Sequence, residues 1–405
     1  MSKNLIRKKL LNIFKSTLKS LQPEQLLEKQ LPDMDYRIYH KIVIFGIGKA
    51  AKKMAEAVSR KLPKKPDLVY LADEGHPLPT MIGVKKTEKI ISEASKLTQN
   101  DLAIVLISGG GSAMFVKPAV GILLNDKIEI TKKLLRSGAN INEINIIRKH
   151  ISHVKGGQFA KILYPAKVIS FIISDVIGND LGTIASGPLI PDQSTFEDAI
   201  NILNKYHIKP PKNIQEYLKK GVNNTNLETP KSNDVFFKDF KLKIVADHKL
   251  VAHIAEQHAR RLGFTTEIYS THLSGESRDK SRKMVRSCLK PILYIASGET
   301  TVTIKGEGSG GRNQEFVLAA LPLIKRNQTM IAISTDGIDG ICPEPIAGAF
   351  ADYQIKLAAK NAKLDLKKFL ANNDSYNFFK NVDGLIRTGP TGTNVGDFVL
   401  LYNQK

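Results

Sequence analysis

Short apolar runs alternate with amphipathic stretches along most of this chain, and this alternation is the feature that most constrains its fold. The runs have the length and β-branched composition of buried strands. They lie at 41–46, 67–72, 101–108, 167–174, 242–247, 266–270, 291–297, 301–306 and 330–336. Amphipathic stretches such as 49–62 and 250–263 predict helices between them. The pattern predicts an α/β protein whose parallel sheets are covered by helices.

The length of the chain favours two domains. With 405 residues, it is longer than one hydrophobic core usually organises. Residues 221–240 are polar and interrupted by Gly and Pro, so they are the best candidate for a linker. We therefore expect one domain over residues 1–232 and a second over residues 233–405.

Composition is that of a soluble globular protein, with 42% hydrophobic and 24% charged residues. There is no apolar run of about 18 residues that could span a membrane, and the basic N-terminus has the spacing of a helix face rather than of a signal peptide. The two cysteines, Cys288 and Cys342, lie far apart and have no metal-ligand spacing. We expect a cytoplasmic protein without a membrane partner.

The net charge of +21 has two interpretations. One is a nucleic-acid binder. The other is a lysine-rich surface together with a site for anionic substrates. Because the basic residues are scattered over helical stretches, with no zinc-finger spacing and no aromatic–arginine pattern, the second interpretation is favoured. We expect no nucleic-acid partner.

Most of the 29 glycines gather in a few short stretches, several of which directly follow a strand candidate. In open α/β sheets, ligands bind at the carboxyl ends of the strands, so these loops are expected to converge on one cleft. Glycine lets backbone N–H groups approach an anion closely, and neighbouring Ser and Thr hydroxyls suit phosphate oxygens. The pattern predicts a phosphate-binding site.

The first glycine loop carries a lysine. Gly46, Gly48 and Ala51 form G-x-G-x-x-A, which fits a nicotinamide-cofactor fingerprint but not a P-loop. Lys49, at the expected start of a helix, is either a solvated side chain or an ammonium group aimed at an anion.

The second loop is the run Ser108, Gly109, Gly110, Gly111 and Ser112, which follows a fully apolar strand candidate. A simple turn needs fewer glycines. The loop therefore predicts a nest of N–H groups that cradles phosphate.

A basic segment follows. Arg148 and Lys155 are candidate anion-binding residues. His150 and His153 have helical spacing and could ligate a metal ion, but no acidic residue is near them in the sequence and the surrounding charge is positive. Anion binding is the favoured interpretation of this segment.

Asp175 and Asp180 follow the next strand candidate. Carboxylates in this position suit Mg²⁺, which takes oxygen ligands together with phosphates. They could also cap turns, or one could act as a general base toward a hydroxyl group.

The densest glycine segment, residues 296–316, predicts strand, turn, a further strand over 301–306, loop and helix, with Arg312 at the start of that helix. A guanidinium group there can bind carboxylate or phosphate through two parallel hydrogen bonds. Near the C-terminus, Thr391 and Asn394 precede a last strand and are either binding residues or parts of a tight turn.

These segments, taken in order, resemble those of the MOFRL-type glycerate kinases. The resemblance rests on GIGKA, SGGGSA, IRKHISHVKGGQFA, SDVIGNDLGTIASGP, SGETTVTIKGEGSGGRNQE, STDGIDG and TGPTGTNVGD, and it spans roughly residues 5 to 403. It implies two α/β domains, a Rossmann-like N-terminal one and a smaller C-terminal MOFRL-type one, with the active site in the cleft between them. The essential lysine and arginine of the family fall on Lys49 and Arg312.

The resemblance also implies a reaction. The family transfers the γ-phosphoryl group of ATP to D-glycerate with Mg²⁺ or another divalent cation, and the expected product is 2-phosphoglycerate. One departure is the run ICPEPIAGAF after the DGIDG segment, where Glu344 is a candidate substitute for an acidic residue of the family.

The mechanistic hypothesis places the ATP phosphates on residues 108–112, the metal ion on Asp175 or Asp180, and the C2 hydroxyl group against Asp175. Lys49 and Arg312 would stabilise the transferring group or hold the glycerate carboxylate. Two alternatives remain: an NAD(P)-dependent hydroxypyruvate reductase that uses the G-x-G-x-x-A loop, and a non-catalytic nucleotide or nucleic-acid binder. The residues leave open C2 against C3 phosphorylation, the nucleotide and metal preference, and whether the chain forms a homodimer.

Overall fold

The structure is a computed structural model that describes residues 3–27, 30–238 and 240–405. The chain folds into two compact units, each of which is described by itself. Unit 1 comprises Met1–Leu26, Asp175–Gly178 and Ala246–Lys405. Unit 2 comprises Leu27–Ser174 and Asn179–Val245.

Unit 2 is built on a five-stranded sheet in the order β2-β1-β3-β4-β5. The strands are β1 (Ile42–Ile47), β2 (Leu68–Ala72), β3 (Leu102–Ile107), β4 (Lys167–Ile173) and β5 (Phe240–Ala246). Strand β1 pairs in parallel with β2 and β3, and β3 pairs in parallel with β4. Every residue of β1 and β3 is buried, as expected for parallel strands covered on both faces.

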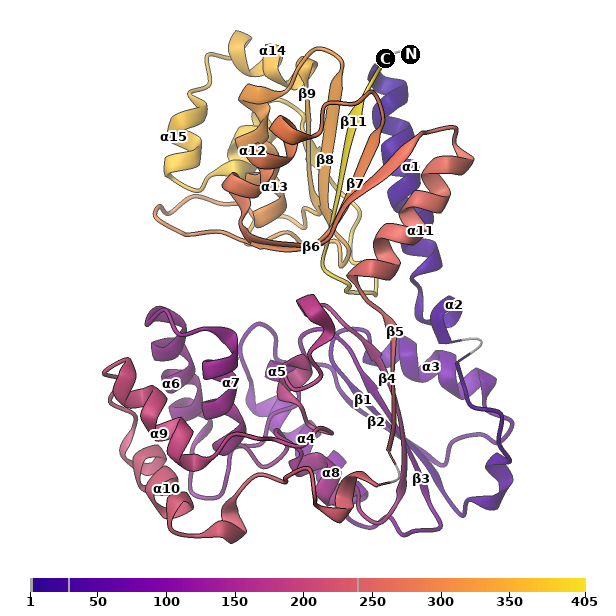
Figure 1. Cartoon of the computed structure of the whole chain (residues 1–405), viewed down its shortest axis with the longest axis vertical. Helices are drawn as coiled ribbons and strands as arrows, with labels where there is room; N and C mark the ends of the chain where they lie inside the picture. Colours follow the sequence, from indigo (N-terminus) through magenta and orange to yellow (C-terminus); the bar gives the residue numbers. More distant parts are fainter. Residues whose placement is uncertain (1–2, 28–29, 239) are drawn as a thin grey trace. The chain divides into compact units, whose positions relative to one another are not determined.

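The helices of unit 2 fall into two groups (Figure 1). Helices α3 and α4 pack against the sheet. Helices α6, α7, α9 and α10 pack around a separate apolar cluster that includes Ile130, Ile147, Phe196 and Leu218. The helices are α3 (Ala51–Lys61), α4 (Met81–Ala94), α5 (Gly111–Met114), α6 (Leu124–Arg136), α7 (Ile141–His150), α8 (Gln158–Leu163), α9 (Phe196–Lys205) and α10 (Lys212–Val222).

Unit 1 contains a six-stranded sheet in the order β10-β9-β8-β11-β7-β6. The strands are β6 (Thr266–Glu276), β7 (Leu293–Thr301), β8 (Gln328–Ser334), β9 (Gly348–Asp352), β10 (Leu385–Ile386) and β11 (Asp397–Asn403). Only the β6–β7 pair is parallel among the pairings that the described residues make in this sheet. The predicted parallel sheet is therefore wrong for unit 1, because β11 runs opposite to β7 and β8, and β9 runs opposite to β8 and β10. An apolar run carries no signal of strand direction.

Helices cover both faces of this second sheet. Successive residues of β11 point to opposite faces, so the ring of Phe398 stacks on Phe14 of α1 at 5.8 Å, while Val399 joins the apolar cluster that includes Phe316 of α13. Helix α1 lies beside α11 (Figure 1). The helices are α1 (Lys3–Ser20), α11 (His248–Arg261), α12 (Ser277–Ser287), α13 (Arg312–Ala320), α14 (Tyr353–Asn361), α15 (Leu366–Ala371) and α16 (Ser375–Asn381), and a short α2 (Pro23–Leu27) follows α1.

The predicted strand over 301–306 is wrong. Strand β7 ends at Thr301, and the segment after it is a loop. The N–H groups of Lys305 and Gly306 donate to the side-chain oxygen of Asn373 at 2.8 and 3.1 Å. A side-chain amide therefore satisfies the backbone groups that a strand partner would otherwise take.

Residues 221–238, within the expected linker, pack inside unit 2. Glu228 accepts from the His150 ring at 2.9 Å, and the Thr229 hydroxyl donates to Asp192 at 3.2 Å. Unit 2 then continues through β5 to Val245. The division between residues 232 and 233 stays a prediction.

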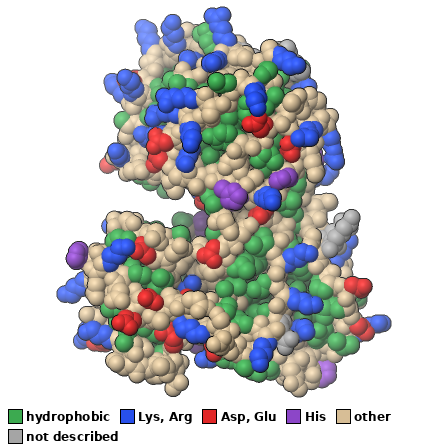
Figure 2. Space-filling view, viewed as in Figure 1, with side chains coloured by type: hydrophobic (Ala, Val, Ile, Leu, Met, Phe, Trp, Pro, Cys, Tyr) green, Lys and Arg blue, Asp and Glu red, His purple; other side chains and the backbone are tan. Residues whose placement is uncertain are grey.

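Within the described residues, no helix has the length and apolar character needed to cross a membrane. Figure 2 shows Lys and Arg side chains scattered over the face in view rather than gathered in one patch. On that face, the distribution of the +21 net charge is that of a generally basic surface.

Arg7 should anchor α1 to unit 1. Its Nε and Nη2 donate to the two oxygens of the fully buried Asp352 carboxylate at 2.6 and 2.8 Å. Because Arg7→Met leaves this charge buried and unpaired, we expect the free energy of unfolding to fall by about 3 kcal/mol. Urea unfolding would measure the change, with the exposed Lys8→Met as a control expected to stay within about 0.5 kcal/mol.

The Arg7–Asp352 ion pair also predicts how its contribution to stability depends on pH. Burial raises the pKa of Asp352, but Arg7 and the N–H groups of Ile355 and Gln354 outweigh it and hold the pKa below its usual value. The stabilisation is therefore present above the unfolded-state pKa, about 3.9, and is lost as the pH falls through the lower folded-state pKa. Equal urea midpoints for wild type and Arg7→Met at pH 7 would contradict the assignment.

Candidate functional site

The first two glycine loops meet at the carboxyl ends of β1 and β3. Gly48 has φ of +104°, and a Cβ atom added there would lie 2.3 Å from the carbonyl oxygen of Ser108. The N–H of Lys49 donates to the Gly109 carbonyl, and the N–H of Ala50 donates to the Ser108 hydroxyl, both at 3.0 Å. Lys49 is thus fixed beside the run that the sequence predicts to hold phosphate.

A strained turn extends this site. Ala185 and Ser186 have φ of +50° and +62°, a region that residues other than glycine rarely adopt. The hydroxyl of Ser186 lies 3.1 Å from the hydroxyl of Ser112 and donates to the side-chain oxygen of Asn145 at 3.0 Å. Ser186 therefore connects the glycine loop to helix α7.

The segment that begins at Lys155 holds this turn in place. Three successive donors, Lys155 Nζ and the N–H groups of Gly156 and Gly157, bind the three successive carbonyls of Ala185, Ser186 and Gly187 at 3.2, 3.0 and 2.8 Å. Lys155 is fully buried, and burial, with the charges of Lys127 and Arg148, lowers its pKa well below the usual value. Its contact in this structure is with the turn.

Arg148 lies on α7 within the same basic cluster. Its guanidinium is partly buried, which lowers its pKa, and no hydrogen bond or ion pair of the described residues engages it. Its backbone carbonyl accepts from Lys127 Nζ at 3.3 Å, and burial lowers the pKa of Lys127 to about 7. His150, by contrast, is bound to Ile146 and Glu228, so its role in this structure is to hold the helix.

Arg312 begins α13 and lies between two acidic side chains of unit 1. Its Nε lies 2.7 Å from the carboxylate of Asp397, and its Nη1 donates to Glu299. Burial opposes the charge of Arg312, but Asp397 and Glu299 outweigh that effect and raise its pKa above its ordinary value. Arg312 therefore stays charged and is held in one position.

The first turn of α13 is fixed by Asp339. Its two carboxylate oxygens accept the N–H groups of Asn313 and Gln314 at 2.9 and 2.8 Å. The amide nitrogen of Asn313 also bridges Asp339 and Asp397, at 3.1 and 2.8 Å. Burial raises the pKa of Asp339 to about 6, although the N–H groups of Asn313 and Gln314 lower it. This network orients the carboxylate that pairs with Arg312.

Glu299 has an unusual environment for a carboxyl group. Burial raises its pKa to about 7, Arg312 lowers it, and the nearby charges of Asp397 and Asp175 raise it. Its side chain is 37% exposed, so solvent weakens this effect. The raised pKa of Glu299 therefore reflects its partial burial together with repulsion from the neighbouring carboxylates of Asp397 and Asp175.

Asp175 also belongs to unit 1. Its carboxylate accepts from the amide of Asn394 at 3.0 Å, and its backbone carbonyl is bound by the ring of His248. The hydroxyl of Thr391 donates to the Thr335 carbonyl at 2.5 Å. The structure thus brings Asp175, Arg312 and Asn394 together in one unit, whereas Lys49 belongs to the other.

Asp180 belongs to unit 2, where its carboxylate caps its own turn. One oxygen accepts from the N–H of Gly182 at 3.0 Å and the other from the hydroxyl of Thr183 at 2.5 Å. Among residues 3–27, 30–238 and 240–405, no group of three or more His, Cys, Asp or Glu side chains is arranged to hold a metal ion.

Comparisons with known proteins identify the family of the chain. Residues 9–219 match a family described as domain of unknown function (DUF4147), and residues 292–397 match the MOFRL family. A D-glycerate 2-kinase from Thermotoga maritima is 35% identical over 423 residues, which covers 98% of both chains. The chain belongs to the MOFRL-type glycerate kinase family.

Further relatives agree with this membership. A glycerate 2-kinase from Pyrococcus horikoshii is 36% identical over 90% of this chain and 88% of its own length. A relative from Agrobacterium vitis, 35% identical over 96% of this chain and 93% of its own, carries a provisional hydroxypyruvate reductase name. The crystal structure of a Thermotoga maritima glycerate kinase matches with a TM-score of 0.85 and 34% identity, over 99% of this chain and 100% of that one.

Sequence reasoning missed several polar residues of this family member. They are Glu299, Asn313, Asp397 and Asn145. Glu299 and Asp397 lie at the paired ends of neighbouring strands β7 and β11, and acidic residues beside a strand end were a usable signal. Asn313 and Asn145 had none, because an amide inside a helix carries no chemical signature until its partners are known.

In this kinase family member, Gly48→Ala should test the junction between the two loops. We expect a loss of about 3 kcal/mol or more in the free energy of unfolding, because the new methyl group meets the Ser108 backbone. Gly121→Ala is the matched control, since Gly121 also has positive φ but nothing within 4 Å of an added Cβ. It should cost only about 1 kcal/mol. Equal losses in chemical denaturation would contradict the close approach.

Glu299 should give stability a distinct pH dependence. Because its folded-state pKa, about 7, lies above its unfolded-state value, the folded state binds the extra proton between them. Stability relative to Glu299→Gln should therefore decline as the pH rises from 5 to 8. Urea midpoints of the two proteins across this range would measure the difference, and a constant offset would show that the carboxyl group titrates normally.

Proposed function

We propose that this chain is a glycerate kinase that transfers the γ-phosphoryl group of ATP to the C2 hydroxyl group of D-glycerate, giving 2-phosphoglycerate and ADP. The observation that carries the proposal is the similarity to a D-glycerate 2-kinase over 98% of both chains. The glycine loops add a physical reason, since their backbone donors suit a triphosphate.

On unit 2, the run from Ser108 to Ser112 is the proposed cradle for the ATP phosphates. Lys49 lies against it through the Gly109 carbonyl. Phosphoryl transfer leaves little covalent chemistry to the protein, because charge spreads over the phosphoryl oxygens and catalysis is mostly positioning and electrostatic stabilisation. The backbone N–H of Lys49 donates to the Gly109 carbonyl, which anchors the residue whose ammonium group we propose for that work.

On unit 1, Arg312 is the proposed second cation. Its Nε lies 2.7 Å from the Asp397 carboxylate, and its Nη1 donates to Glu299. Because the two carboxylates fix the guanidinium before substrate binds, little reorganisation is needed during the reaction. Thr391 and Asn394, in the segment that precedes Asp397, are the proposed substrate-binding residues of this unit.

Asp175 is the better of the two candidate metal ligands. Both oxygens of Asp180 serve its own turn in unit 2, whereas Asp175 lies in unit 1, where its charge acts on Glu299 beside Arg312. The repulsion that Asp397 and Asp175 exert on Glu299 also fits a nearby cation. A divalent cation would neutralise charge on the phosphates when bound. Asp175 is also the proposed group that orients the C2 hydroxyl.

A provisional reductase name among the relatives keeps hydroxypyruvate reduction as the second candidate. Hydride chemistry would use the G-x-G-x-x-A loop and leave the other glycine segments without a role. Two parallel assays separate the functions: ATP with D-glycerate, and NADH with hydroxypyruvate. The kinase proposal expects turnover in the first assay alone, and turnover in the second assay alone would replace it.

A cytoplasmic location remains part of the proposal.

The two proposed catalytic cations give the sharpest mutational prediction. Lys49→Ala and Arg312→Ala should each lower kcat/KM for ATP and D-glycerate by about 10³-fold or more, because each removes charge stabilisation from the transition state. Steady-state kinetics would measure the loss, and circular dichroism would check folding.

Controls for these variants lie on the same two units. Lys52→Ala and Arg286→Ala remove exposed cations and should retain near-normal activity. Since Arg312→Ala leaves two carboxylates unpaired, Arg312→Lys serves as a second variant that keeps the charge but loses the fork of donors. A folded Lys49→Ala or Arg312→Ala protein within about tenfold of wild type would contradict the assignment.

A further inference from the structure

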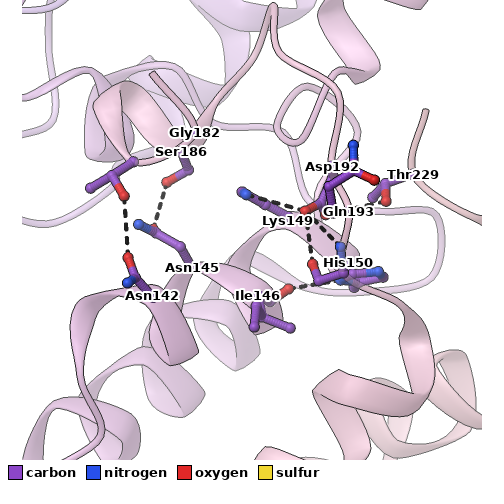
Figure 3. Close-up of polar contacts among 12 residues, drawn as sticks. Asn142, Asn145, Ile146, Lys149, His150, Gly182, Ser186, Asp192, Gln193 and Thr229 are labelled. Carbon is purple, nitrogen blue, oxygen red and sulfur yellow. Dashed lines mark hydrogen bonds and ion pairs between the residues drawn. The ribbon is translucent and has the colours of Figure 1, made fainter. Parts of the chain in front are cut away.

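Unit 2 contains a cavity of about 570 Å³ that none of the proposed roles uses. Three segments line it: one face of α7, residues 179–183 and residues 190–194. Asn142, Asn145 and Lys149 are three or four residues apart, so they lie on the same side of the helix. Figure 3 shows Asn145 and Lys149 extending from α7 toward the segments that carry Ser186 and Asp192.

One polar group in the lining lacks a partner. Asn145 is only 3% exposed, and its side-chain oxygen accepts from Ser186. Its amide nitrogen has no hydrogen-bond partner. Turning the amide over would only exchange which atom is unpartnered, and a buried unsatisfied polar group costs about 1 to 3 kcal/mol. A ligand with hydrogen-bonding edges would satisfy it.

The charged side chains that line the cavity already have partners within the protein. Lys149 Nζ lies 3.2 Å from the buried carboxylate of Asp192 (Figure 3). The same carboxylate accepts the hydroxyl of Ser194 at 2.8 Å. Asp180 is bound by its own turn. A densely charged anion would therefore find no uncompensated cation in this lining, whereas a neutral ligand with hydroxyl groups would find donors and acceptors.

Part of the remaining lining is apolar, and the cavity adjoins the glycine loop through Ser186, which donates to Asn145. Ile146, Leu181, Ile190 and Pro191 contribute the apolar wall. Hydrophobic lining with a few placed polar groups is typical of small-molecule sites, whose volumes run from about 300 to 1,000 Å³. A three-carbon acid such as glycerate would fill little of this space and would bring an unpaired carboxylate.

We propose that this cavity binds the nucleoside end of the phosphoryl donor, with the base against the apolar wall, the ribose hydroxyls near Asp180 and the phosphates directed past Ser186 toward Ser112. The proposal rests on the proposed kinase function and deepens it. Hydroxyl and base edges both donate and accept, so they match Asn145 in either orientation of its amide.

Filling the cavity tests the proposal. The nearest atoms to a Cβ added at Gly182 would be side-chain atoms of Asp180 and Lys149, at 3.3 Å and beyond, and Gly182 does not have positive φ. We expect Gly182→Leu to weaken the binding of ADP and of adenosine by about tenfold or more, measured by calorimetry without glycerate. Inorganic tripolyphosphate, which carries only the phosphate chemistry, should bind unchanged.

Two further proteins make the result specific. Asn201→Leu places the same side chain on the exposed face of α9 and should bind all three probes as wild type does. Asn142→Ala, at the exposed start of α7, removes one amide without filling the cavity and should weaken ADP binding more modestly. It keeps the test valid if Gly182→Leu fails to fold.

A labelling experiment needs no variant. Wild-type protein irradiated with 2-azido-ADP should be modified in peptides that cover residues 142–149 or 179–194, and excess ADP should prevent the modification. Unchanged ADP binding in both cavity variants, or labelling confined to other peptides, would overturn the nucleoside site while the kinase activity stands. The nucleoside site would also be overturned if wild-type protein turned over ATP but showed neither ADP binding nor labelling in these peptides. If the wild-type protein showed no turnover at all, the proposed kinase function itself would be contradicted.

Discussion

A buried carboxylate that caps the start of α13 sets the position of Arg312, the proposed catalytic cation of unit 1. Asp339 accepts an N–H group from the first turn of the helix, and the side-chain amide of Asn313 donates to both Asp339 and Asp397. Asp397 in turn pairs with Arg312. Because Asp339, Asn313 and Asp397 are buried and joined by the hydrogen bonds of Asn313, the Asp397 carboxylate is held in place, and its ion pair orients Arg312 before any substrate arrives.

Unit 2 uses a comparable device with backbone groups. The strained turn at Ala185 and Ser186 is held by three successive donors from the segment that begins at Lys155. Strain of this kind persists only where the surroundings determine it, and it is common at functional sites. Its consequence here is the placement of one hydroxyl, on Ser186, between the glycine loop and Asn145. The glycine loop at residues 108–112 and the turn at residues 185–187 are therefore joined in one structural element.

Much of this was available from the sequence, for physical reasons. Apolar runs of strand length predicted the sheet of unit 2, and the glycine loops at β1 and β3 lie together because parallel strands end at one edge. Strand direction in unit 1 was not available, since burial makes β11 apolar whichever way it runs. Lys155 was predicted as an anion-binding residue, and only the fold reveals that it supports a turn. Lys49, Arg312 and Asp175 stay predictions as catalytic residues.

The fixed cation and the glycine loops suit transfer of a phosphoryl group to one hydroxyl of a three-carbon acid. The most direct test of this function is the product itself. The purified protein, incubated with ATP, Mg²⁺ and D-glycerate, should yield ADP and 2-phosphoglycerate, which ³¹P NMR distinguishes from the 3-phospho isomer. Formation of 3-phosphoglycerate would contradict the assignment of the C2 hydroxyl, and no new phosphate ester at all would contradict the central claim.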